Sequence, residues 1–121
     1  MKVKTSKLTG HALDWAVAVC EGRGIEFDDP RDPWLTRNGV ADQPPHSYTP
    51  STEWAQGGPI IERERIGLSW VESNWRYMDG CWSGVCAGQI RYAPTPLVAA
   101  MRSFVASKLG DEVEVPGELM A

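Results

Sequence analysis

TPLVAAMRSFVASKLG, residues Thr95–Gly110, is the stretch that most clearly predicts a helix. Thr95 suits the N-cap, Pro96 the first helical position, Lys108 the last turn and Gly110 the stop after it. One continuous apolar stripe runs along this helix: Leu97, Ala100, Met101, Phe104, Val105 and Leu109. Because residues three and four apart share a helix face, we predict that this stripe packs into the core and is not a cofactor site.

A second helix is predicted over residues 8–21, capped by Thr5 or Ser6. Apolar side chains cover more than half of its girth, so it should be well buried. These side chains are Leu8, Ala12, Leu13, Trp15, Ala16, Val17, Val19 and Cys20. His11 and Asp14 occupy the remaining narrow polar side, which we expect to face solvent.

Short strands are predicted between the two helices and after the later one. Residues 66–71 alternate at period two. Asp79–Gly80 predicts a two-residue hairpin turn, and this register pairs Tyr77 with Trp82. Two further short strands are predicted at residues 90–92 and 113–115. The sequence therefore predicts an α+β fold, with two main helices packed on a small, mostly antiparallel sheet.

Length and charge indicate a single domain spanning residues 1–121. The net charge of −4 comes from 12 basic and 16 acidic side chains, and residues 111–121 hold four of the acids and no base. The body is therefore neutral and the C-terminal tail acidic.

Turn-forming residues dominate from about residue 28 to residue 47, which predicts a long loop, although Trp34 and Leu35 within it need apolar cover.

Sequence patterns for catalysis, metal binding and cofactor binding are missing. Only His11 and His46 offer an imidazole, and neither a Walker loop nor a dinucleotide fingerprint occurs. Glu62 and Glu64 are two residues apart, so they point to different sides of a helix or strand. The cysteines, Cys20, Cys81 and Cys86, are expected to be free thiols without a metal. Nucleic-acid binding is not expected without a basic stripe, and no apolar run is long enough to span a membrane.

The segment Tyr48–Arg65, YTPSTEWAQGGPIIERER, combines residue types that suit a planar, phosphorylated ligand. Aromatic rings can stack on a nucleobase, which contributes roughly 1–3 kcal/mol. Backbone amides at glycines can hold an anion, an arginine can bind a phosphate in bidentate fashion, and hydroxyls can bond a ribose. The candidate ligand-binding residues are Tyr48, Ser51, Thr52, Trp54, Gly57, Gly58 and Arg63.

The same residues also fit a purely structural role. Ser51 or Thr52 can open a single turn that stops at Gly57–Gly58, and Pro59 can begin another short helix. The Glu–Arg pairs would then lie on a solvated face. This alternative explains Trp54 and Arg63 least well, so they are the strongest candidates.

Three segments resemble the NinX-like family of lambdoid phages. They are KVKTSKLTGHALDWAVAVCEG (residues 2–22), YTPSTEWAQGGPIIERERI (48–66) and PTPLVAAMRSFVASKLGDEVEVP (94–116), and together they cover more than half of the chain. The resemblance implies a phage accessory protein of unassigned activity in the cytoplasm of the infected bacterium, without catalytic residues to carry over. In size and type, the chain is also similar to small phage α+β proteins that sequester nucleotide immune signals, as in anti-Thoeris and anti-CBASS counter-defence.

We therefore expect a non-catalytic protein that sequesters a nucleotide-derived signal, of the cyclic ADP-ribose type or a cyclic dinucleotide, as a homo-oligomer. The alternative is an accessory protein that modulates a host or phage replication or recombination protein. That alternative requires an exposed apolar patch and no enclosed pocket. A third hypothesis is hydrolysis of a nucleotide signal, which would depend on His11, His46 or Glu62. Whether Trp54 faces a cavity or the core bears directly on this choice.

Overall fold

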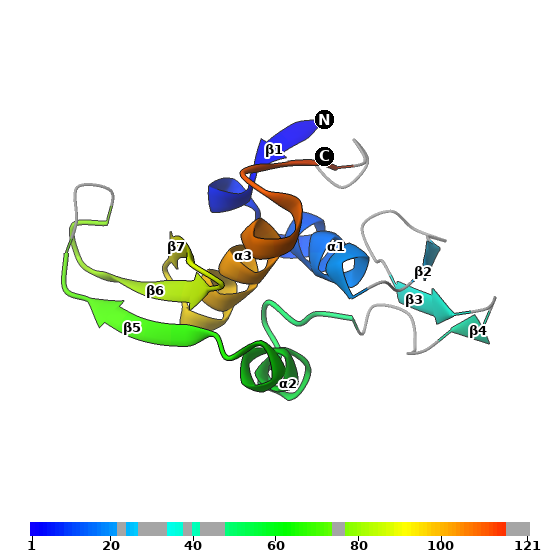
Figure 1. Cartoon of the computed structure of the whole chain (residues 1–121), viewed down its shortest axis with the longest axis horizontal. Coiled ribbons are helices and arrows are strands. Elements are labelled where there is room, and N and C mark those ends of the chain that lie inside the picture. Colours follow the sequence, from blue (N-terminus) through cyan, green and yellow to red (C-terminus); the bar gives the residue numbers. More distant parts are fainter. Residues whose placement is uncertain (22–23, 27–33, 38–39, 42–47, 74–76, 116–121) are drawn as a thin grey trace.

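The computed structural model describes residues 1–21, 24–26, 34–37, 40–41, 48–73 and 77–115. Within these ranges it has three α-helices and a short 3-10 helix (Thr5–Lys7), together with small antiparallel sheets. The helices are α1 (Gly10–Cys20), α2 (Trp54–Glu64) and α3 (Pro96–Leu109). This arrangement confirms the predicted α+β fold, although with three helices in place of two main ones. Figure 1 shows α3 in the middle, between the sheet that contains β5 and β6 and helix α1.

Helix α3 begins and ends as its sequence predicts. The Thr95 hydroxyl accepts a hydrogen bond from the Val98 backbone N–H (3.3 Å), and Gly110 follows the last turn with φ of 87°. Most of the predicted stripe is buried, but Leu109 is exposed. Arg102 on α3 is also buried, and it donates hydrogen bonds to the carbonyls of Leu8 (2.7 Å) and Tyr92 (2.8 Å). Its buried guanidinium therefore links α3 to two neighbouring segments by hydrogen bonds.

The largest contact of α3 is with a three-stranded antiparallel sheet, ordered β5–β6–β7. Its strands are β5 (Gly67–Val71), β6 (Cys81–Cys86) and β7 (Gln89–Ala93). Gly84 of β6 allows the close approach, because a Cβ at this position would lie 2.6 Å from the Ala99 carbonyl oxygen. The predicted strands at 66–71 and 90–92 are confirmed.

The predicted hairpin register is wrong. Trp82 pairs with Trp70, and their rings meet edge to face with centroids 5.5 Å apart. Tyr77 instead begins a turn in which the Gly80 N–H bonds its carbonyl at 3.1 Å. A longer connection with an aromatic pair across β5 and β6 thus replaces the tight Asp79–Gly80 hairpin. Trp70 is half exposed, so its ring is only partly covered by this pairing.

The two ends of the described chain form their own ribbon, in which β1 (Lys2–Lys4) pairs with β8 (Glu112–Glu114). The register places Lys2 opposite Glu114 and Lys4 opposite Glu112. Opposite charges across an antiparallel pair stabilise it modestly. The acidic tail is therefore partly matched by the basic N-terminus, and the predicted strand near Val113 is confirmed.

The region around residues 24–41 contains strands that the sequence did not predict. They are β2 (Gly24–Glu26), β3 (Trp34–Arg37) and β4 (Val40–Ala41), paired antiparallel in that order. The predicted loop at about 28–47 therefore includes two short strands, and its other residues lie outside the described ranges. Local turn signals dominated this sequence, whereas strand pairing depends on contacts that no local pattern specifies.

Candidate functional site

The candidate segment Tyr48–Arg65 consists of an irregular stretch followed by one continuous helix, α2. The predicted break at Gly57–Gly58 and the new start at Pro59 are wrong, because all three residues lie inside α2. Gly57 is required for packing: a Cβ there would clash with the Pro50 carbonyl oxygen and lie 2.6 Å from Leu97 Cδ1. A side chain at position 57 would therefore not fit against Pro50 and Leu97 without a shift in the packing of α2.

The position of Gly57 and Gly58 inside α2 also determines which groups their backbone amides can hydrogen-bond. The Gly57 N–H bonds the Glu53 carbonyl at 2.9 Å, and Gly58 lies within the same helical turn. Amides inside an α-helix donate along its axis to the residue four positions earlier. An anion nest at these two residues would require the helix to unwind there.

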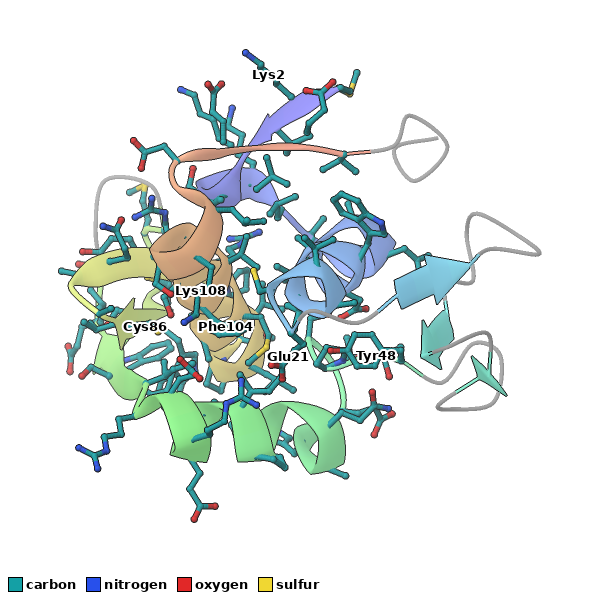
Figure 2. All side chains as sticks on the ribbon, turned by 45° about the vertical axis from the view of Figure 1, so that its right-hand side comes forward. Lys2, Glu21, Tyr48, Cys86, Phe104 and Lys108 are labelled. Atoms are coloured by element: carbon teal, nitrogen blue, oxygen red, sulfur yellow. The ribbon has the colours of Figure 1, made fainter. Side chains whose placement is uncertain are left out.

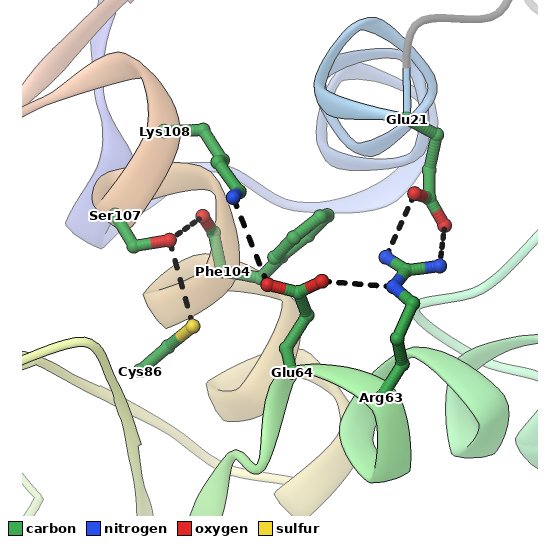
Figure 3. Close-up of polar contacts among 7 residues, drawn as sticks. All are labelled: Glu21, Arg63, Glu64, Cys86, Phe104, Ser107 and Lys108. Carbon is green, nitrogen blue, oxygen red and sulfur yellow. Dashed lines mark hydrogen bonds and ion pairs between the residues drawn. The ribbon is translucent and has the colours of Figure 1, made fainter.

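Arg63 lies at the centre of an ion-pair network between α2 and α1. Its two Nη atoms donate to the Glu21 carboxylate at 3.0 and 2.8 Å, and its Nε donates to Glu64 at 2.8 Å (Figure 3). Lys108 of α3 approaches the other Glu64 oxygen at 3.7 Å, and the guanidinium lies 5.9 Å from the Phe104 ring centroid. The hydrogen bonds that Arg63 donates to Glu21 and Glu64 raise the pKa of Arg63, and its bond to Glu64 lowers the pKa of that carboxyl group.

Tyr48 and Arg63 line the same hollow, which has a volume of about 250 Å³. Glu21 of α1 and Gln56 of α2 contribute further polar groups to it. Figure 2 shows Tyr48 and Glu21 between α1 and α2. The structure thus brings together one predicted aromatic ring and the predicted arginine, but it also places a carboxylate on that arginine.

Trp54 lies on a different side of α2. Its side chain is 54% exposed and lines a groove of about 260 Å³ between the beginnings of α2 and α3. Its described lining is largely apolar and includes no charged residue: Ser51, Thr52, Trp54, Thr95, Pro96, Leu97 and Val98. Trp54 therefore faces an open groove, neither an enclosed pocket nor the core.

Ser51 and Asp14 form a buried polar contact that sequence reasoning missed. The Ser51 backbone N–H donates to Asp14 Oδ1 at 2.9 Å, and both residues are 2% exposed. Burial raises the pKa of Asp14 to about 6, against the opposing effects of Ser51 and His11. The expectation that Asp14 faces solvent is therefore wrong, because the turn before α2 covers it, whereas His11 is exposed. No local pattern could have signalled a contact between residues 37 positions apart.

The other chemistry-bearing residues are scattered. Cys20, Cys81 and Cys86 carry thiols, and burial raises the pKa of Cys20 to about 12. Among the described residues, no group of three His, Cys, Asp or Glu side chains is placed to hold a metal ion. Glu62 is exposed on α2, and His46 lies outside the described residues. In the same part of the chain, no helix has the length and apolar character needed to cross a membrane.

A family model described as "Bacteriophage P22, NinX" matches residues 4–108 of this chain. The match covers the 3-10 helix, α1, α2, the complete β5–β6–β7 sheet and α3 up to Lys108. The chain belongs to the NinX family. It is therefore a phage accessory protein, as its resemblance implied. A search of curated proteins found no match to this NinX-family chain.

The NinX match includes the whole candidate segment, so its two sides belong to the family region of the chain. One side presents Tyr48 and Arg63 with a carboxylate between α1 and α2, and the other presents Trp54 in an uncharged groove. The two sides therefore differ in chemistry: the hollow offers charged and polar groups, whereas the groove offers mainly apolar surface.

Proposed function

We propose that this NinX-family protein acts without catalysis by binding a host or phage protein in the bacterial cytoplasm, with Trp54 as the central anchor. The observation that supports this proposal most directly is the half-exposed Trp54 ring beside an uncharged groove. Tryptophan is enriched among residues that contribute most to protein–protein affinity. The groove fits one large aliphatic or aromatic side chain, and at about 260 Å³ it is smaller than the roughly 300–1,000 Å³ of typical small-molecule pockets.

The expected partner therefore carries an exposed apolar side chain, and a replication or recombination protein remains the proposed class. A photoreactive amino acid at position 54 should cross-link this partner in infected cells, whereas the same probe at the exposed Met78 should not. Trp54→Ala should weaken binding of the purified partner by about tenfold or more. Val98→Asp, which puts a charge into the groove, should have the same effect. Equal cross-linking from both positions, or unchanged affinity of both variants, would exclude this mode of binding.

Sequestration of a nucleotide-derived signal is the second candidate, and one observation favours it: Tyr48 and Arg63 share a hollow. A phosphate would have to replace the Glu21 carboxylate on Arg63, which can occur only if the ligand offers an equally good bidentate contact. Titration calorimetry with cyclic ADP-ribose isomers and cyclic dinucleotides tests this candidate. Binding that is lost in Arg63→Met but retained in Trp54→Ala would favour sequestration over protein binding. Product analysis after incubation would detect hydrolysis, the third hypothesis.

A further inference from the structure

The sheet β5–β6–β7 has two edges, and arginines block only one of them. On β7, the carbonyls of Ile90 and Tyr92 point away from β6. Arg91 Nη1 donates to Ile90 O at 2.7 Å, and Arg102 Nη1 donates to Tyr92 O at 2.8 Å. Arg91 also bonds Thr5 and Asp111, so it stays beside the edge. Another strand could not pair there without displacing these guanidiniums.

Among the residues that the structure describes, no strand pairs with the opposite edge, β5. Backbone groups alternate in direction along an antiparallel strand. The backbone groups of Ile90 and Tyr92 point away from β6, so the β6 residues opposite them, Val85 and Ser83, direct their backbone groups toward β5. The backbone groups of Trp82 and Gly84 on β6 then point toward β7. The partners of Ser83 and Val85 on β5 are Ser69 and Gly67, which leaves the N–H and C=O groups of Leu68 and Trp70 on the outer side. Figure 1 shows β5 as the outermost strand of this sheet.

Nothing in the sequence of β5 protects this edge. Proteins usually protect exposed edges with charged side chains, proline or a bulge. The strand Gly67–Val71 reads GLSWV and has no charge and no proline, and the described part of the structure shows no hydrogen bond to the outer backbone groups of Leu68 or Trp70. An uncharged strand of five residues with a half-exposed tryptophan is suited to pairing with another strand.

The strand is also complementary to itself. A twofold axis through Ser69 pairs Leu68 with Trp70 of a second copy, and these are the residues whose backbone groups face outward. This register satisfies four backbone groups on each strand and covers the exposed Trp70 ring with Leu68 of the other copy. It also brings Arg65, at one end of the strand, near Glu72 of the second copy. Both of these residues are exposed, and the axis repeats their charge pair at the other end.

We propose that the protein forms a twofold dimer in which β5 pairs antiparallel with β5 of a second copy, centred on Ser69. The two sheets then join into one continuous sheet of six strands. This proposal is independent of the partner or ligand bound at α2, because it involves the backbone and exposed side chains of β5. Trp54→Ala should therefore leave the dimer intact, which separates failure of one proposal from failure of the other.

Introducing a charge at the proposed axis gives the sharpest test. Ser69 is exposed, and the two copies of it would face each other at about 4.5 Å between Cα atoms. Ser69→Lys and Ser69→Glu should each raise the dimer dissociation constant by about fivefold or more, because like charges become directly opposed. An equimolar mixture of the two variants should recover a dimer in sedimentation velocity. Thr52→Lys, an exposed site away from the sheet, is the matched control and should dimerise like the wild type.

A cross-link tests the register itself. Ser69→Cys should form a disulfide-linked dimer under mild oxidation, since the expected Cα separation is compatible with a disulfide. Thr52→Cys should not form one. A wild-type chain that sediments as a monomer at every concentration would overturn the proposal. It would also be overturned by a dimer that Ser69→Lys leaves unchanged, or by absence of the Ser69→Cys cross-link in a dimeric sample.

Discussion

Asp14 of α1 accepts a 2.9 Å hydrogen bond from the backbone N–H of Ser51, and both residues are almost completely buried. The contact fixes the stretch before α2 against α1, so it positions the whole candidate segment. It also buries a carboxylate, and a buried carboxylate prefers the protonated form. At this contact, burial favours the protonated form of Asp14, whereas the hydrogen bonds of Ser51 favour the charged form.

Replacing Asp14 with Asn should make stability less sensitive to pH. The folded-state pKa of about 6 lies above the ordinary carboxyl value of 3.8, so the folded protein binds the proton more tightly than the unfolded chain. The stability from this proton is fully present below the unfolded pKa and is lost as pH rises through the folded pKa. Relative to wild type, Asp14→Asn should therefore gain up to about 3 kcal/mol between about pH 4 and about pH 8. Urea unfolding at both pH values measures this difference, with the exposed Asp79→Asn as the control. Parallel pH profiles of Asp14→Asn and wild type would contradict the prediction.

Adjacent glycines in α2 should respond in opposite ways to the same substitution. Gly57→Ala places a methyl group against Pro50 and Leu97, so it should destabilise the fold by about 1–3 kcal/mol. Gly58→Ala meets no atom within 4 Å and should stabilise α2 by up to about 1 kcal/mol, because alanine favours the helix. Thermal unfolding of the two variants provides the comparison. Similar melting temperatures would show that α2 does not pack on α3 through Gly57.

The Arg63 network should contribute modestly and in a salt-dependent manner. Arg63→Lys keeps the charge but loses the bidentate contact with Glu21. Because the arginine is half exposed, the loss in unfolding free energy should stay below about 1 kcal/mol, and it should shrink at high salt. Urea titrations at low and high sodium chloride concentration test this. A loss that is large and independent of salt would mean that Arg63 acts mainly through packing on Phe104.

Arg102 should be far more important for stability. Its guanidinium is buried and bonds the carbonyls of Leu8 and Tyr92. Arg102→Met leaves both carbonyls without this donor, so it should destabilise the protein by about 2–4 kcal/mol. It should also open the β7 edge and increase aggregation during refolding, which light scattering can follow. The exposed Lys7→Met serves as a control, and equal effects of the two changes would refute the proposed role.

Helix α3 could be predicted from sequence because its signals are local. The helix ends are set within one turn by Thr95, Pro96 and Gly110. The apolar stripe from Leu97 to Val105 coincides with the buried side of α3. Helix α2 could not be predicted in the same way. Its glycines and proline favour a break, yet the helix runs through all three, and Gly57 lies where a side chain would meet Pro50 and Leu97. The candidate site was predicted as a set of residues, but its division between two sides of α2 follows from the continuous helix.

The sequence by itself determined the family, the α+β class, the limits of α3 and the unusual composition of the Tyr48–Arg65 segment. Each of these follows from local spacing or from matching residues in order. Only the tertiary structure decided that Arg63 binds Glu21, that Asp14 is buried beneath Ser51, and that β5 has an open edge. These features join residues far apart in the chain, and their formation depends on packing geometry and burial that no local sequence pattern encodes.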